Sequence, residues 1–147
     1  MAWAGGGWSA AYNNFYGQEL ANDQSGRFFN DVVVKTPEFG RLQLAATADY
    51  GIQKRPGAGF SKWCGGAVLG RWKFTERAFG NARLERYVDN DQVIVVPTAR
   101  QGSFKATGAS LGLDVALHRQ LQWRSELRHF WGENPVFPAR SAAGFAK

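Results

Sequence analysis

The chain has 147 residues, a length that suits one domain, with a formal net charge of +6 and a pI of about 9.8. Its cations are spread along the sequence instead of forming a basic tail, which argues against a nucleic-acid-binding protein. The single cysteine, Cys64, excludes an internal disulfide framework, and no apolar run approaches the length of a transmembrane helix.

Alternating polar and apolar residues dominate the sequence, and the side chains of a β-strand point to opposite faces with this period of two. In chain order, the alternation and the turn residues predict strands at 8–16, 27–36, 40–54, 62–74, 78–88, 104–117 and 121–132, followed by a tail at 133–147. Most of these strands are long, since strands of globular proteins usually have about five or six residues. Together they predict one domain, 1–147, that is a β-barrel or a fragment of one.

The predicted hairpin at 62–88 shows the pattern most clearly. On its first strand, Trp72 alternates with the cations Arg71 and Lys73. Charge and apolarity do not recur every three to four residues, so a helix is excluded. The hairpin therefore has one apolar and one charged face, and either a protein core or lipid must cover the apolar one.

The breaks between the predicted strands are sorted by length. Tight breaks at 37–39, 75–77 and 118–120 alternate with longer ones at 17–26, 55–61 and 89–103. In an up-and-down meander, alternate connections lie at the same end of the sheet, so the tight turns share one end and the long loops the other. Long strands with this asymmetry are typical of transmembrane β-barrels. Residues 93–96 are a candidate for a further short strand.

The two faces of the predicted strands differ in composition. We expect the charged residues to line a lumen that holds water or paired charges: Arg41, Asp49, Arg71, Lys73, Arg83, Glu85, Asp114, Arg124, Glu126 and Arg128. On the other face, aliphatic residues form a middle band, and we expect the aromatic residues near the strand ends to lie at the two lipid–water interfaces: Tyr50, Trp72, Phe74, Trp123 and Trp131. The sequence therefore predicts an all-β, antiparallel, up-and-down transmembrane β-barrel of about eight strands.

Two residues fall on the apolar face by parity although they are not apolar, namely Arg86 and His129. An arginine that faces lipid costs about 2–4 kcal/mol at the membrane midplane but about 0–1 kcal/mol near an interface. Both residues lie near the end of the sheet that carries the long loops. We therefore expect Arg86 to extend its side chain to lipid phosphates at this rim.

Several strand-end motifs resemble those of the OmpL-like group of beta-barrel porins. These motifs are a WYGGAL-type strand, a basic–aromatic pair before a T-[DE]-[KR] turn, an RxEYxxD strand end, and a late strand similar to LRLEYRHDW. The matching residues are Trp63, Gly65, Gly66, Ala67, Phe74, Thr75, Glu76, Arg77, Glu85, Tyr87, Asp89, Arg124, Glu126, Arg128, His129 and Trp131. The resemblance covers roughly residues 27–137. It implies an outer-membrane porin fold and passive passage of solutes, with no known substrate and no catalytic residue.

The strand count leaves the closure of the barrel open. The pattern predicts seven strands, whereas single-chain bacterial barrels have even numbers. An eighth strand would come from 136–147, from 93–96 or from outside the chain; otherwise the chain is a fragment or part of a larger assembly, because open sheet edges are excluded from lipid. The first residues, MAWAGGGW, lack the basic start and apolar core of a secretory signal, so we expect an exported protein to be represented here in mature or shortened form.

The expected function is that of a porin-like channel of the cell outer membrane, through which small solutes or ions diffuse passively. The expected lumen residues comprise six cations and four anions, which favours a modest anion preference. The expected partners are the lipid bilayer and lipopolysaccharide, with no nucleic acid, and the protein is expected as a homo-oligomer or within a larger membrane assembly. No cofactor, metal or catalytic residue is expected.

Three alternatives remain open. A barrel closed at eight strands leaves room only for side chains, and its role would be that of a structural or adhesive outer-membrane subunit. A soluble ligand-binding β-barrel would have the two faces inverted, with an apolar cavity. A barrel-borne hydrolase or acyltransferase would need a nucleophile beside a base, but no G-x-S-x-G motif occurs and the candidates show no motif spacing: Ser110, Ser125, His118 and His129.

Overall fold

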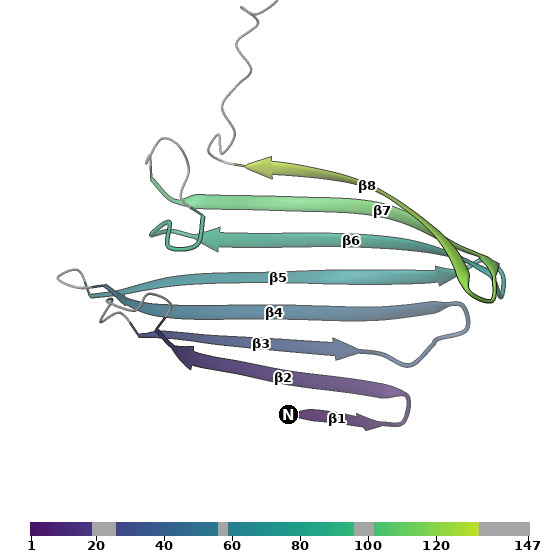
Figure 1. Ribbon diagram of the computed structural model, residues 1–147, viewed down its shortest axis with the longest axis horizontal. Helices are drawn as coiled ribbons and strands as arrows, with labels where there is room; N and C mark the ends of the chain where they lie inside the picture. The colour runs from purple at the N-terminus through teal and green to yellow at the C-terminus, as the bar shows by residue number, and fades with distance from the viewer. Residues whose placement is uncertain (19–25, 56–58, 96–101, 133–147) are drawn as a thin grey trace, which may run out of the picture.

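The computed structural model describes residues 1–18, 26–55, 59–95 and 102–132, and their regular structure is all β (Figure 1). The strands are β1 Ala2–Gly5, β2 Trp8–Gly17, β3 Arg27–Lys35, β4 Leu42–Arg55, β5 Gly59–Lys73, β6 Ala78–Asp89, β7 Phe104–His118 and β8 Leu121–Gly132. They form one sheet in chain order, with every neighbouring pair antiparallel. The predicted all-β, up-and-down fold is therefore confirmed. Within the described ranges, no helix is long and apolar enough to cross a membrane.

The eighth strand, β1, lies where the sequence pattern did not predict one. It forms a hairpin with β2 through Gly6 and Gly7, whose φ angles of 59° and 79° are in the left-handed region that glycine adopts without strain. β1 has only four residues, too few for an alternation to be recognised. Residues 93–95, the described part of the candidate short strand, form no strand, so that prediction is wrong there. The other candidate, 136–147, lies outside the described residues.

The connections are sorted by length less strictly than predicted. β4 and β5 pair as far as Arg55 and Gly59, so the connection predicted at 55–61 covers only 56–58. The turn before β4 is wider than predicted, because β4 begins at Leu42, which forms an isolated bridge with Phe39. The remaining sorting holds: the turns at 74–77 and 119–120 lie at the opposite end of the sheet from the connections at 18–26 and 90–103 (Figure 1).

The sheet is open, with β1 and β8 as its edges. Each of these two strands pairs with a single neighbour among the described strands. β8 bends out of the plane near its turn with β7 (Figure 1), where the register shifts between Ala116 and His118. Such an open, curving sheet of long antiparallel strands is the arrangement expected of part of a barrel.

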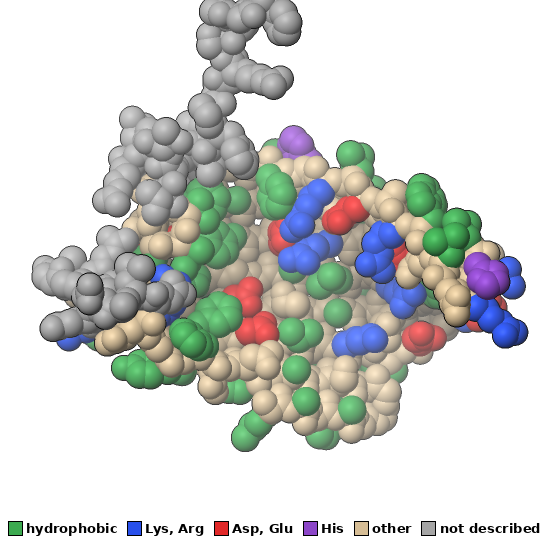
Figure 2. Space-filling view, in the orientation of Figure 1, with side chains coloured by type: hydrophobic (Ala, Val, Ile, Leu, Met, Phe, Trp, Pro, Cys, Tyr) green, Lys and Arg blue, Asp and Glu red, His purple; other side chains and the backbone are tan. Residues whose placement is uncertain are grey.

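The two faces of the sheet differ in chemistry and in exposure. On the face that we call the apolar face, Leu127, Leu111 and Val68 are 79%, 68% and 58% exposed. Figure 2 shows Lys, Arg, Asp and Glu side chains gathered on the opposite face, which we call the polar face. On the polar face Asp114 is only 6% exposed, and Ser110 is also buried. Side chains crowd together on the concave side of a curved sheet and splay apart on the convex side, so the polar face is the concave one.

Candidate functional site: the polar face of the sheet

The strand register places most of the predicted lumen residues on the polar face. They are Asp49 on β4, Arg71 and Lys73 on β5, Arg83 and Glu85 on β6, Asp114 on β7, and Arg124, Glu126 and Arg128 on β8. Arg41 differs, because it lies in the turn before β4 and is exposed. The same face carries three charged residues of β3 that were not predicted, because adjacent apolar residues obscure the facing of that strand: Arg27, Asp31 and Lys35.

Glu85 is the centre of an ion network that spans three strands. Its carboxylate accepts hydrogen bonds from Nε of Arg83 on the same strand and from Nε of Arg128 on β8, each at 3.0 Å. β7 runs between β6 and β8, and the β7 residue opposite Glu85 is Gly108. A Cβ on Gly108 would lie 2.6 Å from Oε1 of Glu85 and 2.8 Å from the ring of Phe130. The absence of a side chain at 108 therefore lets Glu85 and Arg128 meet across β7.

A second ion pair joins β7 and β8 nearer the tight turns. Arg124 donates from Nε to Oδ1 of Asp114 at 2.8 Å and from Nη2 to Oδ2 at 3.3 Å. The two residues are Cα partners in the register, so the pair needs no bend in either strand. A guanidinium that donates two parallel hydrogen bonds fixes both the position and the charge of its carboxylate.

Not every cation of the polar face has a carboxylate partner. The guanidinium of Arg71 lies over the ring of Phe79, 3.8 Å from its centroid, in a cation–π contact. Lys73 pairs with Glu76 of the following turn at 2.7 Å. In the described part of the chain, no salt bridge involves Arg71 or Lys35. Their charge is therefore available to a solute.

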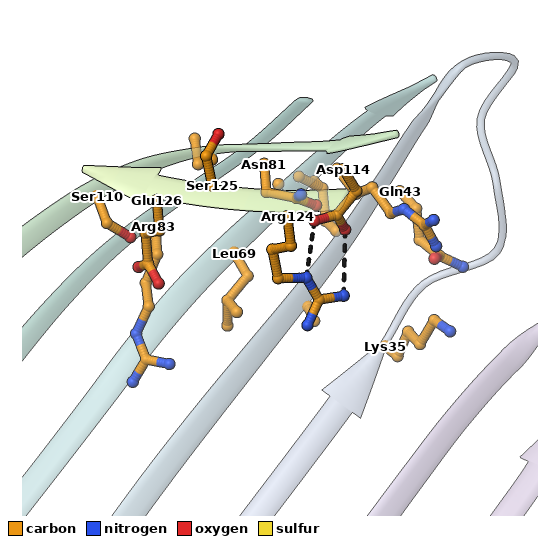
Figure 3. Close-up of a pocket in the computed structure, with 16 residues that line it drawn as sticks. Lys35, Gln43, Leu69, Asn81, Arg83, Ser110, Asp114, Arg124, Ser125 and Glu126 are labelled. Carbon is orange, nitrogen blue, oxygen red and sulfur yellow. Dashed lines mark hydrogen bonds and ion pairs between the residues drawn. The ribbon is translucent and has the colours of Figure 1, made fainter. Parts of the chain in front are cut away.

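A cavity of about 420 Å³ lies on this part of the polar face (Figure 3). In Figure 3 the Asp114–Arg124 pair lies centrally, with Arg83 to one side and Gln43 and Lys35 to the other. The charged residues that line the cavity are four cations, Lys35, Arg71, Arg83 and Arg124, and two carboxylates, Asp114 and Glu126. The lining therefore carries an excess of positive charge.

Carboxylates without a guanidinium lie on β3 and β4. Asp31 and Asp49 are Cα partners on the polar face, and Asn13 donates a hydrogen bond from Nδ2 to Oδ2 of Asp31 at 2.8 Å. The ion pairs described above lie on β6, β7 and β8. Among the described residues, the ion pairs of β6, β7 and β8 thus lie toward one edge of the sheet, and Asp31 and Asp49 lie toward the other.

The end of the polar face near the long connections is closely packed around aromatic side chains. Trp63 and Phe104 are buried, and the rings of Tyr87 and Phe104 are 5.9 Å apart. The indole of Trp63 lies over Gly51, where a Cβ would be 2.0 Å from the ring, and the guanidinium of Arg27 is 5.3 Å from the indole centroid. Side chains rather than open space therefore occupy the polar face at this end.

Asp89, the last residue of β6, is fully buried at 0% exposure. The register places it on the polar face between Trp63 and Phe104. Its Oδ1 accepts a hydrogen bond from the backbone N–H of Val93 at 2.9 Å, and its Oδ2 accepts those of Ile94 and Val95 at 2.8 and 3.2 Å. These charge-assisted bonds hold the segment 93–95 against the polar face. The sequence marked Asp89 only as the end of a strand motif, which carries no role by itself.

The predicted interfacial aromatics lie on the apolar face or at its turn. All are between 40% and 53% exposed: Tyr50, Trp72, Phe74, Trp123 and Trp131. Trp72, Phe74 and Trp123 lie at or beside the tight turns at 74–77 and 119–120. Tyr50 and Trp131 lie toward the opposite end of their strands.

The residues considered for catalysis are dispersed. Ser110 lies on the polar face, whereas His129 lies on the apolar face, edge-on to Trp131 at 4.6 Å. Because side chains on opposite faces of one sheet cannot touch, Ser110 and His129 cannot act together as nucleophile and base. Within the residues that the structure describes, no group of three His, Cys, Asp or Glu side chains could hold a metal ion.

Comparison with known proteins assigns the chain to a family. Residues 2–144 match the family described as "Putative beta-barrel porin-2, OmpL-like", which confirms the resemblance drawn from the strand-end motifs. No curated protein and no solved structure matches the chain. The antiparallel, up-and-down sheet agrees with the family description. The chain therefore belongs to the OmpL-like family of beta-barrel porins.

Proposed function

We propose that this sheet forms part of the wall of a water-filled outer-membrane channel, through which small solutes diffuse without catalysis and anions pass more readily than cations. Membership of a porin family supports the channel. The exposure of the apolar face supports the membrane position, since a soluble barrel would bury Leu111 and Leu127 inside and expose its charges. In this arrangement the polar face lines the lumen and the apolar face contacts lipid.

The single observation that carries the anion preference is the lining of the cavity in Figure 3. Four cations and two carboxylates line it, and Arg71 and Lys35 have no carboxylate partner in the described part of the sheet. A ring of fixed positive charge raises the local concentration of anions and repels cations. Arg124 and Asp114 form a neutral pair, so the preference rests on the other cations of the lining, Lys35, Arg71 and Arg83, against the single carboxylate Glu126.

The membrane position also requires that the edges of the sheet be covered. Lipid offers no hydrogen-bond partner, so the outer edges of β1 and β8 must pair with further strands in the bilayer. These strands would come from the same polypeptide or from another copy in an oligomer. The exposed aromatics at both ends of the apolar face would then lie at the two lipid–water interfaces.

The test is conductance in planar bilayers under a KCl gradient. Folded full-length protein should form open channels with a reversal potential that reports a higher permeability for chloride than for potassium. Arg71→Glu should reverse this preference, because it replaces an unpaired cation of the cavity by an anion. Arg77→Glu, the same substitution in an exposed turn, is the matched control and should leave the reversal potential within error. Channels that pass potassium better, or an equal shift in both variants, would contradict the anion preference; folded, inserted protein without conductance would contradict the channel.

A further inference from the structure

The apolar face carries ionic charge at one end only, and that charge has one sign. Four cations point to this face, one on each of four consecutive strands, and we call them the outer basic cluster: Lys54 on β4, Lys62 on β5, Arg86 on β6 and Lys105 on β7. No Asp or Glu falls on the same face of the described strands. All four cations lie in the part of their strand next to the connections at 56–58 and 90–103.

The strand register brings these cations together in two diagonal pairs, Arg86 with Lys105 and Lys54 with Lys62. Val88 on β6 is the Cα partner of both Cys64 on β5 and Lys105 on β7. Arg86 lies two positions from Val88 along β6, and Lys54 lies two positions along β4 from Ile52, the Cα partner of Lys62. Diagonal neighbours of this kind have Cα atoms about 7–8 Å apart, a distance that one multiply charged group can bridge.

Arg86 is fixed in place by a contact on the apolar face. Its Nη1 donates a hydrogen bond to Oγ1 of Thr107, its Cα partner on β7, at 2.7 Å. Trp131 on β8 is the next residue in this row, and Tyr50 on β4 is the partner of Cys64 in the adjacent row. The cations are thus bordered by amphipathic aromatic rings of the kind found at the level of lipid headgroups.

An apolar hollow of about 730 Å³ begins one row from Arg86 on the same face. Its lining includes Leu84, Leu111, Leu127 and Trp131. Along the strands, the cations therefore lie nearest the long connections, and the apolar hollow lies further toward the middle of the sheet. That order matches a lipid whose anionic headgroup lies at the rim and whose acyl chains run down the wall.

We propose that the outer basic cluster binds the phosphate groups of lipid A, the glycolipid anchor of lipopolysaccharide; this inference rests on the membrane position proposed above. In outer-membrane barrels the longer connections face the exterior, so the cluster would lie in the leaflet that contains lipopolysaccharide. Lipid A carries two phosphates on one headgroup and several acyl chains. The cluster supplies cations on adjacent strands, and the hollow beneath it supplies an apolar surface for the chains.

The test compares two double variants of equal charge loss. Folded full-length protein in detergent micelles is titrated with bisphosphorylated lipid A, and bound lipid is measured by native mass spectrometry. Arg86→Gln with Lys105→Gln should weaken binding by about twenty-five-fold, since each cation near a lipid headgroup contributes about a factor of five. Arg77→Gln with Arg119→Gln removes two exposed cations from the tight turns and should change binding less than about twofold. Heat-modifiable migration in electrophoresis verifies that each variant is folded.

Each outcome bears on the proposal directly. Loss of binding in the cluster variant alone, together with weak binding of dephosphorylated lipid A by the wild type, would support it. Equal binding by both double variants, or equal binding of phosphorylated and dephosphorylated lipid, would overturn it. Bilayer conductance of the same preparations separates the two proposals, because a channel that conducts without binding lipid A refutes only this one, and a protein that binds lipid A without conducting refutes only the channel.

Discussion

Arg124 on β8 and Asp114 on β7 are Cα partners, and their side chains differ greatly in exposure, 70% for Arg124 and 8% for Asp114. Removing one or the other therefore has unequal consequences. Arg124→Gln leaves a buried carboxylate without its guanidinium, whereas Asp114→Asn leaves an exposed guanidinium that water can solvate.

We expect Arg124→Gln to lower the melting temperature of the folded protein by about 2–8 °C and Asp114→Asn to lower it by less than half as much. The double variant should melt above Arg124→Gln, because it leaves no unpaired buried charge. Heat-modifiable electrophoresis at a series of temperatures measures this order. A larger loss for Asp114→Asn than for Arg124→Gln would show that the pair is not asymmetric.

Gly108 gives a second prediction, because it lies on β7 between Glu85 on β6 and Arg128 on β8 and has no side chain that would block their contact. Gly108→Val should push both side chains away from the middle of β7 and lower the melting temperature, by about 2–8 °C. Gly70→Val is the matched control on the apolar face, where a Cβ would meet only Leu44 at an ordinary distance of 3.6 Å. If the Glu85–Arg128 pair accounts for the loss, Arg128→Gln should cost little further stability in the Gly108→Val background. An equal lowering of the melting temperature in the two valine variants would show that Gly108 has no special role.

The long strands and their two faces were predictable because alternation is a local signal. Along β4 each apolar side chain is followed by a polar or small one, and this period of two suffices to assign the faces of a strand. The same rule assigned Arg71, Glu85 and Arg124 to the polar face without any knowledge of their neighbours. It failed on β3, where adjacent phenylalanines and valines occupy both faces and hide Asp31.

What could not be predicted depends on contacts between strands and segments. The sequence gives no sign that Gly108 stands between Glu85 and Arg128, since this requires the register of three strands. Nor does it show that Asp89 binds the backbone at 93–95, because a carboxylate at a strand end is usually solvated. The aromatic packing around Trp63 follows from Gly51 on another strand and was missed for the same reason.

The assignment of the two faces to lipid and lumen gives a third prediction. Trp123 is exposed on the apolar face, whereas Trp63 is buried on the polar face. In bilayers of brominated lipid, a variant that retains only Trp123 should lose most of its fluorescence, because bromine quenches indole on contact. A variant that retains only Trp63 should lose little. Equal quenching of both, or stronger quenching of Trp63, would invert the faces and favour a soluble barrel with an apolar interior.

The last prediction concerns Asp89 and the segment that it holds. Three backbone N–H groups at 93–95 bond to one buried carboxylate, and Gln92 also reaches the opposite side of the connection by donating from Nε2 to the carbonyl of Gly102 at 2.6 Å. Asp89 has Trp63 and Phe104 as its Cα partners on the polar face, so in the proposed channel the segment bonded to it would narrow the end near the long connections. Releasing it should widen this end.

Asp89→Asn replaces one of the two acceptor oxygens by an amide nitrogen, which cannot accept a hydrogen bond. At least one of these backbone hydrogen bonds is therefore lost. With Cys64 replaced by serine and Val93 by cysteine, we expect Asp89→Asn to raise the rate of modification by a water-soluble thiol reagent by about tenfold, since a charged hydrogen bond contributes roughly that factor. Single-channel conductance should rise in the same variant without the cysteine. Asp91→Asn is the matched control, because Asp91 is exposed and accepts a longer bond from the backbone of Lys62 at 3.3 Å. An unchanged modification rate in Asp89→Asn would mean that the aromatic packing, and not the carboxylate, holds the segment in place.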